Sequence, residues 1–438
     1  MSTPFDFPYI SAKQWKNSIQ FQLDGEDYAT LIKKTTDQVS IKPFYHPDED
    51  FHTLNWKINT QLSLCFPLFF HPERNFSIDA SEFNYSQNIS WHFSSKLSLI
   101  ENTFSLPKDI HQQFVFFNKY DENSVISFYK KYSSSNIHLA YDPIYHLAKE
   151  GNFYDNYKND IKLYKTISTQ FSKFFSLFID TTIYAQSGAT DVQQIAFSLA
   201  HLNEYLTIIP NFEGKIIIKW AIGTDFWVET AKFQAFEYLL QILLAEYSTN
   251  CSYEFFTTAS NRWTCNINSE WNELALNNAL QIAHTINSSF HEIRTANQKS
   301  KRDFNENKIA YNRSKKMLDE WSLPTTNTLF TNSLSVQLAE KSWELFKKIE
   351  RNDGLISQLF KGTIQKSIAE AELKSTEKFL NNNKEYFISF EPIAKEYIQN
   401  HTMYFKKILS KNIRKTKIRP IIEKNVWTPF YRNIFYKK

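Results

Sequence analysis

The chain has 438 residues, of which 42% are hydrophobic and 16% aromatic, and its formal net charge is only +4. This composition supplies a large buried core and excludes an intrinsically disordered chain. A nucleic-acid-binding domain usually gathers its basic side chains on one face, and here a single stretch is strongly basic. We interpret that stretch as solvated surface and expect no nucleic-acid partner; it comprises Lys406, Lys407, Lys411, Arg414, Lys415, Lys417 and Arg419.

The cysteines, Cys65, Cys251 and Cys265, show no Cys-x-x-Cys spacing. An odd number of widely spaced cysteines favours neither a disulfide framework nor a zinc site, and fits reduced thiols. The first residues lack a charged segment followed by an apolar one, and no apolar run approaches the roughly 18 residues that span a bilayer. We therefore expect a cytoplasmic protein without membrane contact or bound metal.

Residues 1–40 are predicted to form an N-terminal arm. Within it, residues 14–23 carry Trp15, Ile19 and Leu23 at helical spacing, and Gly25 is a plausible stop. A short amphipathic helix cannot bury its apolar stripe alone. We therefore expect the arm to pack on its own domain or on a partner subunit.

Strand and helix signals alternate through the middle of the chain. Strands are predicted at 136–142, 175–184, 215–222 and 252–258, and helices at 191–209, 227–247 and 271–286. This alternation is typical of a parallel sheet covered by helices, whose strands are apolar on both faces. The fold class is therefore predicted to be α/β, as a (β/α)₈ barrel over residues 41–400.

In such a barrel the chemistry lies where strands end, which directs attention to Asp142, Tyr184, Gly223 and Thr257. From about residue 305 the strand signal fades, and helices are predicted at 305–320, 333–352 and 357–380. Residues 401–438 read as a basic and aromatic tail. Its aromatic residues are expected to dock on the body: Trp427, Phe430, Tyr431, Phe435 and Tyr436.

A search for catalytic motifs is negative. The sequence holds no P-loop, GxGxxG, GxSxG or HExxH motif. A retaining glycosidase needs two carboxylates roughly 5 Å apart, and Asp142 and Asp180 are available but not paired by spacing. His111, in the run 109–113 (DIHQQ), partly matches the Asp-x-His-x-x-Gly motif of cobalamin proteins, but Phe114 replaces the glycine, and we interpret the match as chance.

Several segments, in one order along most of the chain, share motifs with a known family. They are residues 14–16, 21–28 and 41–46, residues 142–148 (DPIYHLA) with 151–153, residues 184–189 (YAQSGA) and 192–200 (VQQIAFSLA) with 203–206, and residues 309–312 and 337–346. Together they resemble the small subunit of methylmalonyl-CoA mutase, within the cobalamin-dependent acyl-CoA mutases. The resemblance implies a barrel that, in the catalytic chain, threads acyl-CoA along its axis and meets adenosylcobalamin at one end.

The sequence departs from the catalytic pattern of that family in three ways. It stops at residue 438, so we expect no cobalamin-binding domain. The family's histidine, ahead of a Gly-Trp pair, aligns with Thr257, a poor proton donor to a thioester. The family's DPAGGS turn aligns with residues 323–328 (LPTTNT), which lack the conformational freedom of glycine.

These departures imply a small, non-catalytic subunit that stabilises a large catalytic chain in a heterodimer. That large chain would interconvert methylmalonyl-CoA and succinyl-CoA and bind adenosylcobalamin. In this chain we predict no catalytic, cofactor-binding or metal-ligating residue. The alternative is a free-standing barrel enzyme, either an acyl-CoA mutase of altered specificity or a carbohydrate-active hydrolase.

Overall fold

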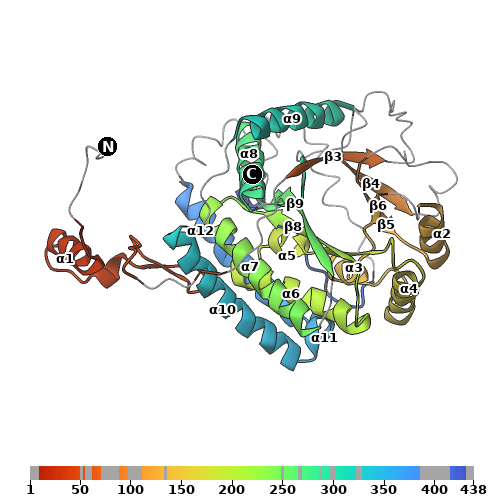
Figure 1. Ribbon diagram of the computed structural model, residues 1–438, viewed down its shortest axis with the longest axis horizontal. Coiled ribbons are helices and arrows are strands. Elements are labelled where there is room, and N and C mark those ends of the chain that lie inside the picture. Colours follow the sequence, from red (N-terminus) through yellow and green to blue (C-terminus); the bar gives the residue numbers. More distant parts are fainter. Residues whose placement is uncertain are drawn as a thin grey trace, which may run out of the picture.

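The computed structural model describes residues 9–49, 53–54, 62–70, 88–96, 111–132, 136–247, 251–264, 269–286, 288–294, 301–321, 328–384 and 415–430. Within these ranges a parallel eight-stranded sheet curls into a nearly closed barrel surrounded by helices (Figure 1). The strands, in order around the barrel, are β6 (Ile137–Leu139), β5 (Gln113–Lys119), β4 (Asn88–Lys96), β3 (Ser63–Phe70), β10 (Phe290–Glu292), β9 (Ser252–Ala259), β8 (Lys215–Ile222) and β7 (Ser176–Asp180). The predicted (β/α)₈ barrel is confirmed.

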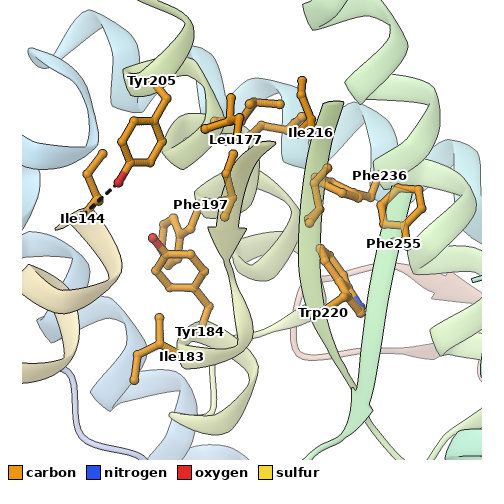
Figure 2. Close-up of a cluster of buried hydrophobic side chains, with 14 of the residues drawn as sticks. Ile144, Leu177, Ile183, Tyr184, Phe197, Tyr205, Ile216, Trp220, Phe236 and Phe255 are labelled. Atoms are coloured by element: carbon orange, nitrogen blue, oxygen red, sulfur yellow. Dashed lines mark hydrogen bonds between the residues drawn. The ribbon is translucent and has the colours of Figure 1, made fainter. Parts of the chain in front are cut away.

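Helices cover the outside of the barrel. They are α2 (Glu122–Tyr132), α3 (Pro143–Glu150), α4 (Tyr157–Gln170), α5 (Thr182–Gln186), α6 (Asp191–Ile208), α7 (Phe226–Glu246), α8 (Ser269–Thr285), α9 (Lys301–Glu320), α10 (Leu329–Arg351), α11 (Gly354–Lys361) and α12 (Thr363–Asn382). Figure 2 shows part of the apolar core between strands and helices, where Trp220 and Phe255 of the sheet face Phe236 of α7. Because side chains alternate along a strand, Phe256, the residue after Phe255, points to the inside of the barrel.

The seam between β6 and β7 is closed by side chains. At the carboxyl ends of these strands, the backbone N–H of Asp180 donates to Asp142 Oδ2 at 2.8 Å. At their amino ends, His138 Nδ1 lies 2.9 Å from the hydroxyl of Ser176. These two links join strands that no ladder of backbone hydrogen bonds connects in the described sheet.

Asp142 also organises the helices behind this seam. Its Oδ1 accepts from the N–H of Tyr145 in the first turn of α3 (2.9 Å) and from the hydroxyl of Tyr205 on α6 (2.6 Å), and lies 3.1 Å from His201 Nε2. Burial alone would raise the pKa of Asp142, but His201 and these hydrogen bonds hold it below its usual value. The Asp142 carboxylate therefore stays ionised inside the protein, because both of its oxygens accept hydrogen bonds from the groups around it.

The N-terminal arm stands away from the body, with α1 (Ala12–Gln22) at its tip (Figure 1). A 3₁₀ turn η1 (Tyr28–Leu31) and the paired strands β1 (Lys33–Lys34) and β2 (Ser40–Ile41) follow. Trp15 and Tyr28 of the arm pack edge-on against Phe44, which follows the arm, at 5.8 and 5.7 Å between ring centroids, and the three rings form a small core. The side-chain amide of Gln337 on α10 binds both backbone groups of Ser40, so the base of the arm is fixed to the body.

The predicted elements match closely, with two corrections. The strand predicted at 175–184 ends at Asp180, because the Asp180 carboxylate accepts from the N–H and hydroxyl of Thr182 and so opens the short helix α5. The single helix predicted at 357–380 is two helices, α11 and α12. They part at Gly362, whose φ of +75° is a conformation that glycine adopts readily.

Among the described residues, none of the helices combines the length and the apolar composition that a bilayer-spanning segment needs.

We predict that Asp142→Asn costs about 3 kcal/mol of unfolding free energy. An amide has one acceptor oxygen, so at least one buried donor around residue 142 loses its partner. Urea unfolding followed by circular dichroism measures the loss. Asp353→Asn, at an exposed carboxylate paired with Lys361, is the control and should cost less than about 1 kcal/mol. Equal stability of the two variants would contradict this account of the seam.

Candidate functional site

The inside of the barrel is filled by its own apolar core. One side chain from each of six strands contributes, together with Ala140 just after β6, and the cluster is separate from the core under the helices. Its members are Cys65, Phe114, Ala140, Phe178, Ile217, Phe256 and Phe290, with Phe116 packed against them.

Phenyl rings meet across the barrel axis. Phe114 of β5 and Phe256 of β9 belong to strands four places apart in either direction around the barrel, and so lie on opposite walls. Their ring centroids are nevertheless only 4.5 Å apart, and Phe114 lies 5.0 Å from Phe290. Aromatic rings at this separation are in van der Waals contact. The two walls therefore touch at the centre of the barrel.

A charged layer lies directly above these rings, two residues closer to the carboxyl ends of the strands. Glu292 of β10 is fully buried, with Oε1 3.0 Å from His92 Nε2 and Oε2 3.5 Å from the ammonium of Lys219. The Lys219 ammonium also lies over the ring of Phe116, 4.1 Å from its centroid. An ammonium over an aromatic face is stabilised by the ring quadrupole.

The ring of His92 is held between two phenyl rings. Phe69 and Phe116 stack on its two sides, each with a centroid distance of 4.5 Å and an interplanar angle of 5°. The guanidinium of Arg294 lies 5.1 Å from the centroid of Phe69. The upper part of the barrel is thus occupied by stacked rings with cations at their faces.

The charges in this layer compensate one another. Burial alone would raise the pKa of Glu292, but Lys219, His92 and Arg294 hold it well below its usual value. Burial lowers the pKa of His92 to about 4, against the opposing effect of Glu292. At neutral pH His92 is therefore uncharged and donates a hydrogen bond to an ionised Glu292, whose charge Lys219 balances.

The residue aligned with the family's histidine does not face the axis. Thr257 lies in β9 between the inward Phe256 and the inward Thr258, so its own side chain points outward. Its hydroxyl lies 2.9 Å from both the Ser288 hydroxyl and His291 Nδ1. Neither Thr257 nor Thr258 offers an acid at this strand.

Asp142 and Asp180, the carboxylates considered for a glycosidase, do come close together. The contact is between the Asp142 carboxylate and the backbone of Asp180, and both side chains are buried. Asp142 is engaged with α3 and α6, and Asp180 with Thr182. Both carboxylates are thus engaged in joining β6 to β7 and in starting α3 and α5, and this geometry does not place them on either side of a sugar.

The carboxyl-end side of the barrel is crossed by residues 415–430, here called the strap. Its backbone N–H groups donate to the segments that follow β6, β7 and β9: Ile421 to Ala148 O (2.7 Å), Lys424 to Gln186 O (2.8 Å) and Val426 to Arg262 O (3.0 Å). Trp427 is completely buried and Phe430 nearly so. The expected docking of the tail is confirmed for these two residues; Tyr431, Phe435 and Tyr436 lie outside the described residues, as do the basic residues 406–414.

His111, the nearest match to a cobalt ligand, lies just before β5 and its Nδ1 is 3.3 Å from Asn88 Oδ1, at the amino ends of the strands. The mutase chemistry of the resemblance belongs to the opposite, carboxyl side. Within the described ranges, no group of three or more His, Cys, Asp or Glu side chains could hold a metal ion. The aligned DPAGGS turn, at 323–328, falls almost entirely outside them.

Sequence reasoning missed the residues that fill the barrel, Phe114, Phe256, Phe290, Glu292 and Lys219. A signal existed for Lys219, since a lysine in the middle of an apolar strand (KIIIKWAI) must find a buried partner. Its partner Glu292 comes from a three-residue strand that the pattern did not reveal.

A family model described as methylmalonyl-CoA mutase matches residues 140–423, well over half of the sequence. The chain belongs to the methylmalonyl-CoA mutase family. The matched part begins just after β6 and includes β7, β8, β9 and β10, the seam carboxylate Asp142, and residues 415–423 of the strap.

Two curated relatives are named methylmalonyl-CoA mutase. The protein from Rhizobium meliloti (strain 1021) is 27% identical over 223 residues, which are 45% of this chain and 30% of the relative. The protein from Cereibacter sphaeroides is 25% identical over 229 residues, or 47% of this chain and 31% of the relative. The alignments thus span less than a third of each of these mutase-family proteins.

We predict that Phe256→Ala destabilises the protein by about 3–5 kcal/mol, since it leaves a cavity between opposite walls. Phe174→Ala, at a ring that is 45% exposed, is the matched control and should cost about 1 kcal/mol or less. Both losses are measured by urea unfolding. A Phe256→Ala variant as stable as the control would mean that the axis is not closed by packing.

Proposed function

We propose that this chain is the small, non-catalytic subunit of a heterodimeric methylmalonyl-CoA mutase. A longer chain of the same family would bind adenosylcobalamin and interconvert methylmalonyl-CoA and succinyl-CoA. This chain would stabilise that catalytic subunit by association.

The closed barrel axis is the observation that carries the proposal. A barrel that threads an acyl-CoA needs an open path through the centre, where this chain has Phe114 against Phe256 at 4.5 Å. Above them the space is taken by His92 between Phe69 and Phe116. Moving these rings aside would expose buried apolar surface and separate a buried charge pair, which is costly.

The missing acid supports the same conclusion. A histidine that donates a proton to the thioester must lie within hydrogen-bond reach of the substrate. At the aligned position Thr257 faces away from the axis and is occupied by Ser288 and His291. Among the titratable groups that face the axis, Lys219, Glu292 and His92 are engaged with one another.

The arm is the surface that we expect to contact the catalytic chain. At its tip Phe21 is 85% exposed, with Ile10 and Trp15 also exposed and Ile19 and Leu23 half-buried. The small core of Trp15, Tyr28 and Phe44 gives this projection a defined shape before any partner binds. An obligate subunit interface often buries more than about 2,000 Å² and is rich in apolar contacts, which an extended apolar arm helps to supply.

The purified chain, given adenosylcobalamin and methylmalonyl-CoA, should produce no succinyl-CoA above the enzyme-free rate. Mixed with the longer mutase chain of the same genome, it should elute as a complex and raise that chain's activity or thermal stability. The longer chain alone is the control. Turnover by this chain alone, or a shift in the cobalamin spectrum on titration with it, would sink the proposal; so would failure of the two chains to associate.

Replacing the exposed apolar residues at the tip of the arm should weaken the complex selectively. We predict that Ile10→Ser with Phe21→Ser raises the Kd at least about tenfold, as expected when apolar anchors of an interface are lost. Leu274→Ser, at a residue that is 67% exposed on α8, should leave the Kd unchanged. Titration calorimetry or surface plasmon resonance measures both variants, and unchanged melting temperatures show that each remains folded. Equal Kd values would exclude the arm as the contact.

A further inference from the structure

Two glutamates meet outside the barrel, where α6, α10 and α11 join. Glu204 of α6 and Glu350 of α10 both face Gly354, the first residue of α11. A Cβ at this glycine would lie 2.7 Å from Glu204 Oε1 and 3.9 Å from Glu350 Oε2. The two carboxylates therefore share one small space that only glycine leaves open.

Glu204 caps α11 from another helix. Asp353, the residue before α11, has φ of +73° and makes no side-chain capping bond. Instead the N–H of Ile356 donates to Glu204 Oε1 at 2.9 Å. The unpaired N–H groups at a helix start need such an acceptor, so the docking of α11 on α6 depends on this carboxylate.

Glu350 is incompletely satisfied. Its Oε2 accepts from the amide of Asn203 at 2.8 Å, and the hydroxyl of Tyr247 donates to the Oδ1 of that amide at 2.6 Å. Its Oε1 is buried and has no hydrogen-bond partner in the part of the chain that the structure describes. An acceptor without a donor becomes a donor itself when it is protonated.

The charged surroundings do not relieve this crowding. Within the described ranges, no Lys or Arg forms an ion pair with either carboxylate. The titratable groups nearby are Tyr157 of α4, Tyr247 of α7 and His201 of α6. Lys361 of α11 pairs with Asp353 instead. Burial, with the charge of Glu204, raises the pKa of Glu350 to about 7. Burial also raises the pKa of Glu204, against the N–H groups of α11 and His201.

We propose that Glu204 and Glu350 form a proton-operated latch: protonation of Glu350 removes the repulsion between the two carboxylates and fastens α11 to α6 and α10, and loss of that proton loosens them. α11 continues through Gly362 into α12, and α12 holds the strap, since Gln365 donates to Arg419 O at 3.0 Å. Thr376 of α12 also accepts from Arg262 at 3.1 Å, and the guanidinium of Arg262 donates to Lys424 O of the strap at 3.4 Å. The latch thus connects proton concentration to the segment that crosses the barrel mouth. It does not depend on the proposed subunit role.

Hydrogen exchange of the full chain at pH 8 and pH 6, corrected for intrinsic exchange rates, tests the latch. An acid with a raised pKa favours the closed form as pH falls, so protection of 354–361 should rise about tenfold between pH 8 and pH 6. Glu350→Gln keeps an uncharged donor at this position and should hold the protection high at both pH values. Glu344→Gln, at an exposed residue of the same helix, should behave like the unchanged chain.

Protection of 354–361 that is equal at the two pH values in the unchanged chain would overturn the proposal. So would a Glu350→Gln variant that keeps the full pH dependence. If Glu350→Gln does not fold, Glu204→Gln replaces it, because removing the neighbouring charge must move the midpoint of the protection change to lower pH. An unchanged midpoint would overturn the latch equally.

Discussion

The buried carboxylate of Asp142 is the constraint on which this barrel depends. It closes the seam to β7 through the backbone of Asp180, caps α3 and binds Tyr205 on α6. A buried charge is tolerated only where several donors surround it. The start of α3, the end of β7 and helix α6 must therefore all be correctly placed around Asp142. Asp142 and Tyr205 lie in two of the segments that resemble the mutase family, residues 142–148 and 203–206, and the geometry gives a physical reason for their pairing.

Once closed, the barrel must fill its interior. Phenylalanines from β5, β7, β9 and β10 do so at mid-height, and a ring of stacked aromatics and compensated charges does so above them. A purely apolar upper layer would pack as well, and buried ion pairs are weak evidence for stability. The Lys219–Glu292–His92 network is better understood as fixing the register of β4, β8 and β10, since a shift of one residue would turn each charge toward the outer apolar core.

The sequence predicted the elements well where an apolar run ends in a clear stop. β8 has the bounds expected from KIIIKWAI and the following Gly223. The errors arose where tertiary contacts decide: Thr182 and Tyr184 favour a strand by propensity, yet Asp180 turns the chain into a helix there. The contact between Phe114 and Phe256 could not be predicted, because alternation along each strand does not tell which face points to the axis. Gly362 alone does not predict a break between two helices, because a single glycine is also tolerated within a helix.

This chain keeps the barrel fold of its family but has a packed interior in place of an open channel. A channel for acyl-CoA would require small side chains at the positions of Phe114, Phe256 and Phe290, and a mobile charge layer above them. This chain has the opposite arrangement: rings in contact across the axis, and Glu292 neutralised from two sides. A packed barrel cannot open for a substrate without losing its interior core, but it can hold an arm at a fixed position. Among the large apolar side chains of the described residues, Phe21 at the tip of that arm is the most exposed, and the body to which the base of the arm is fixed gives it a defined position.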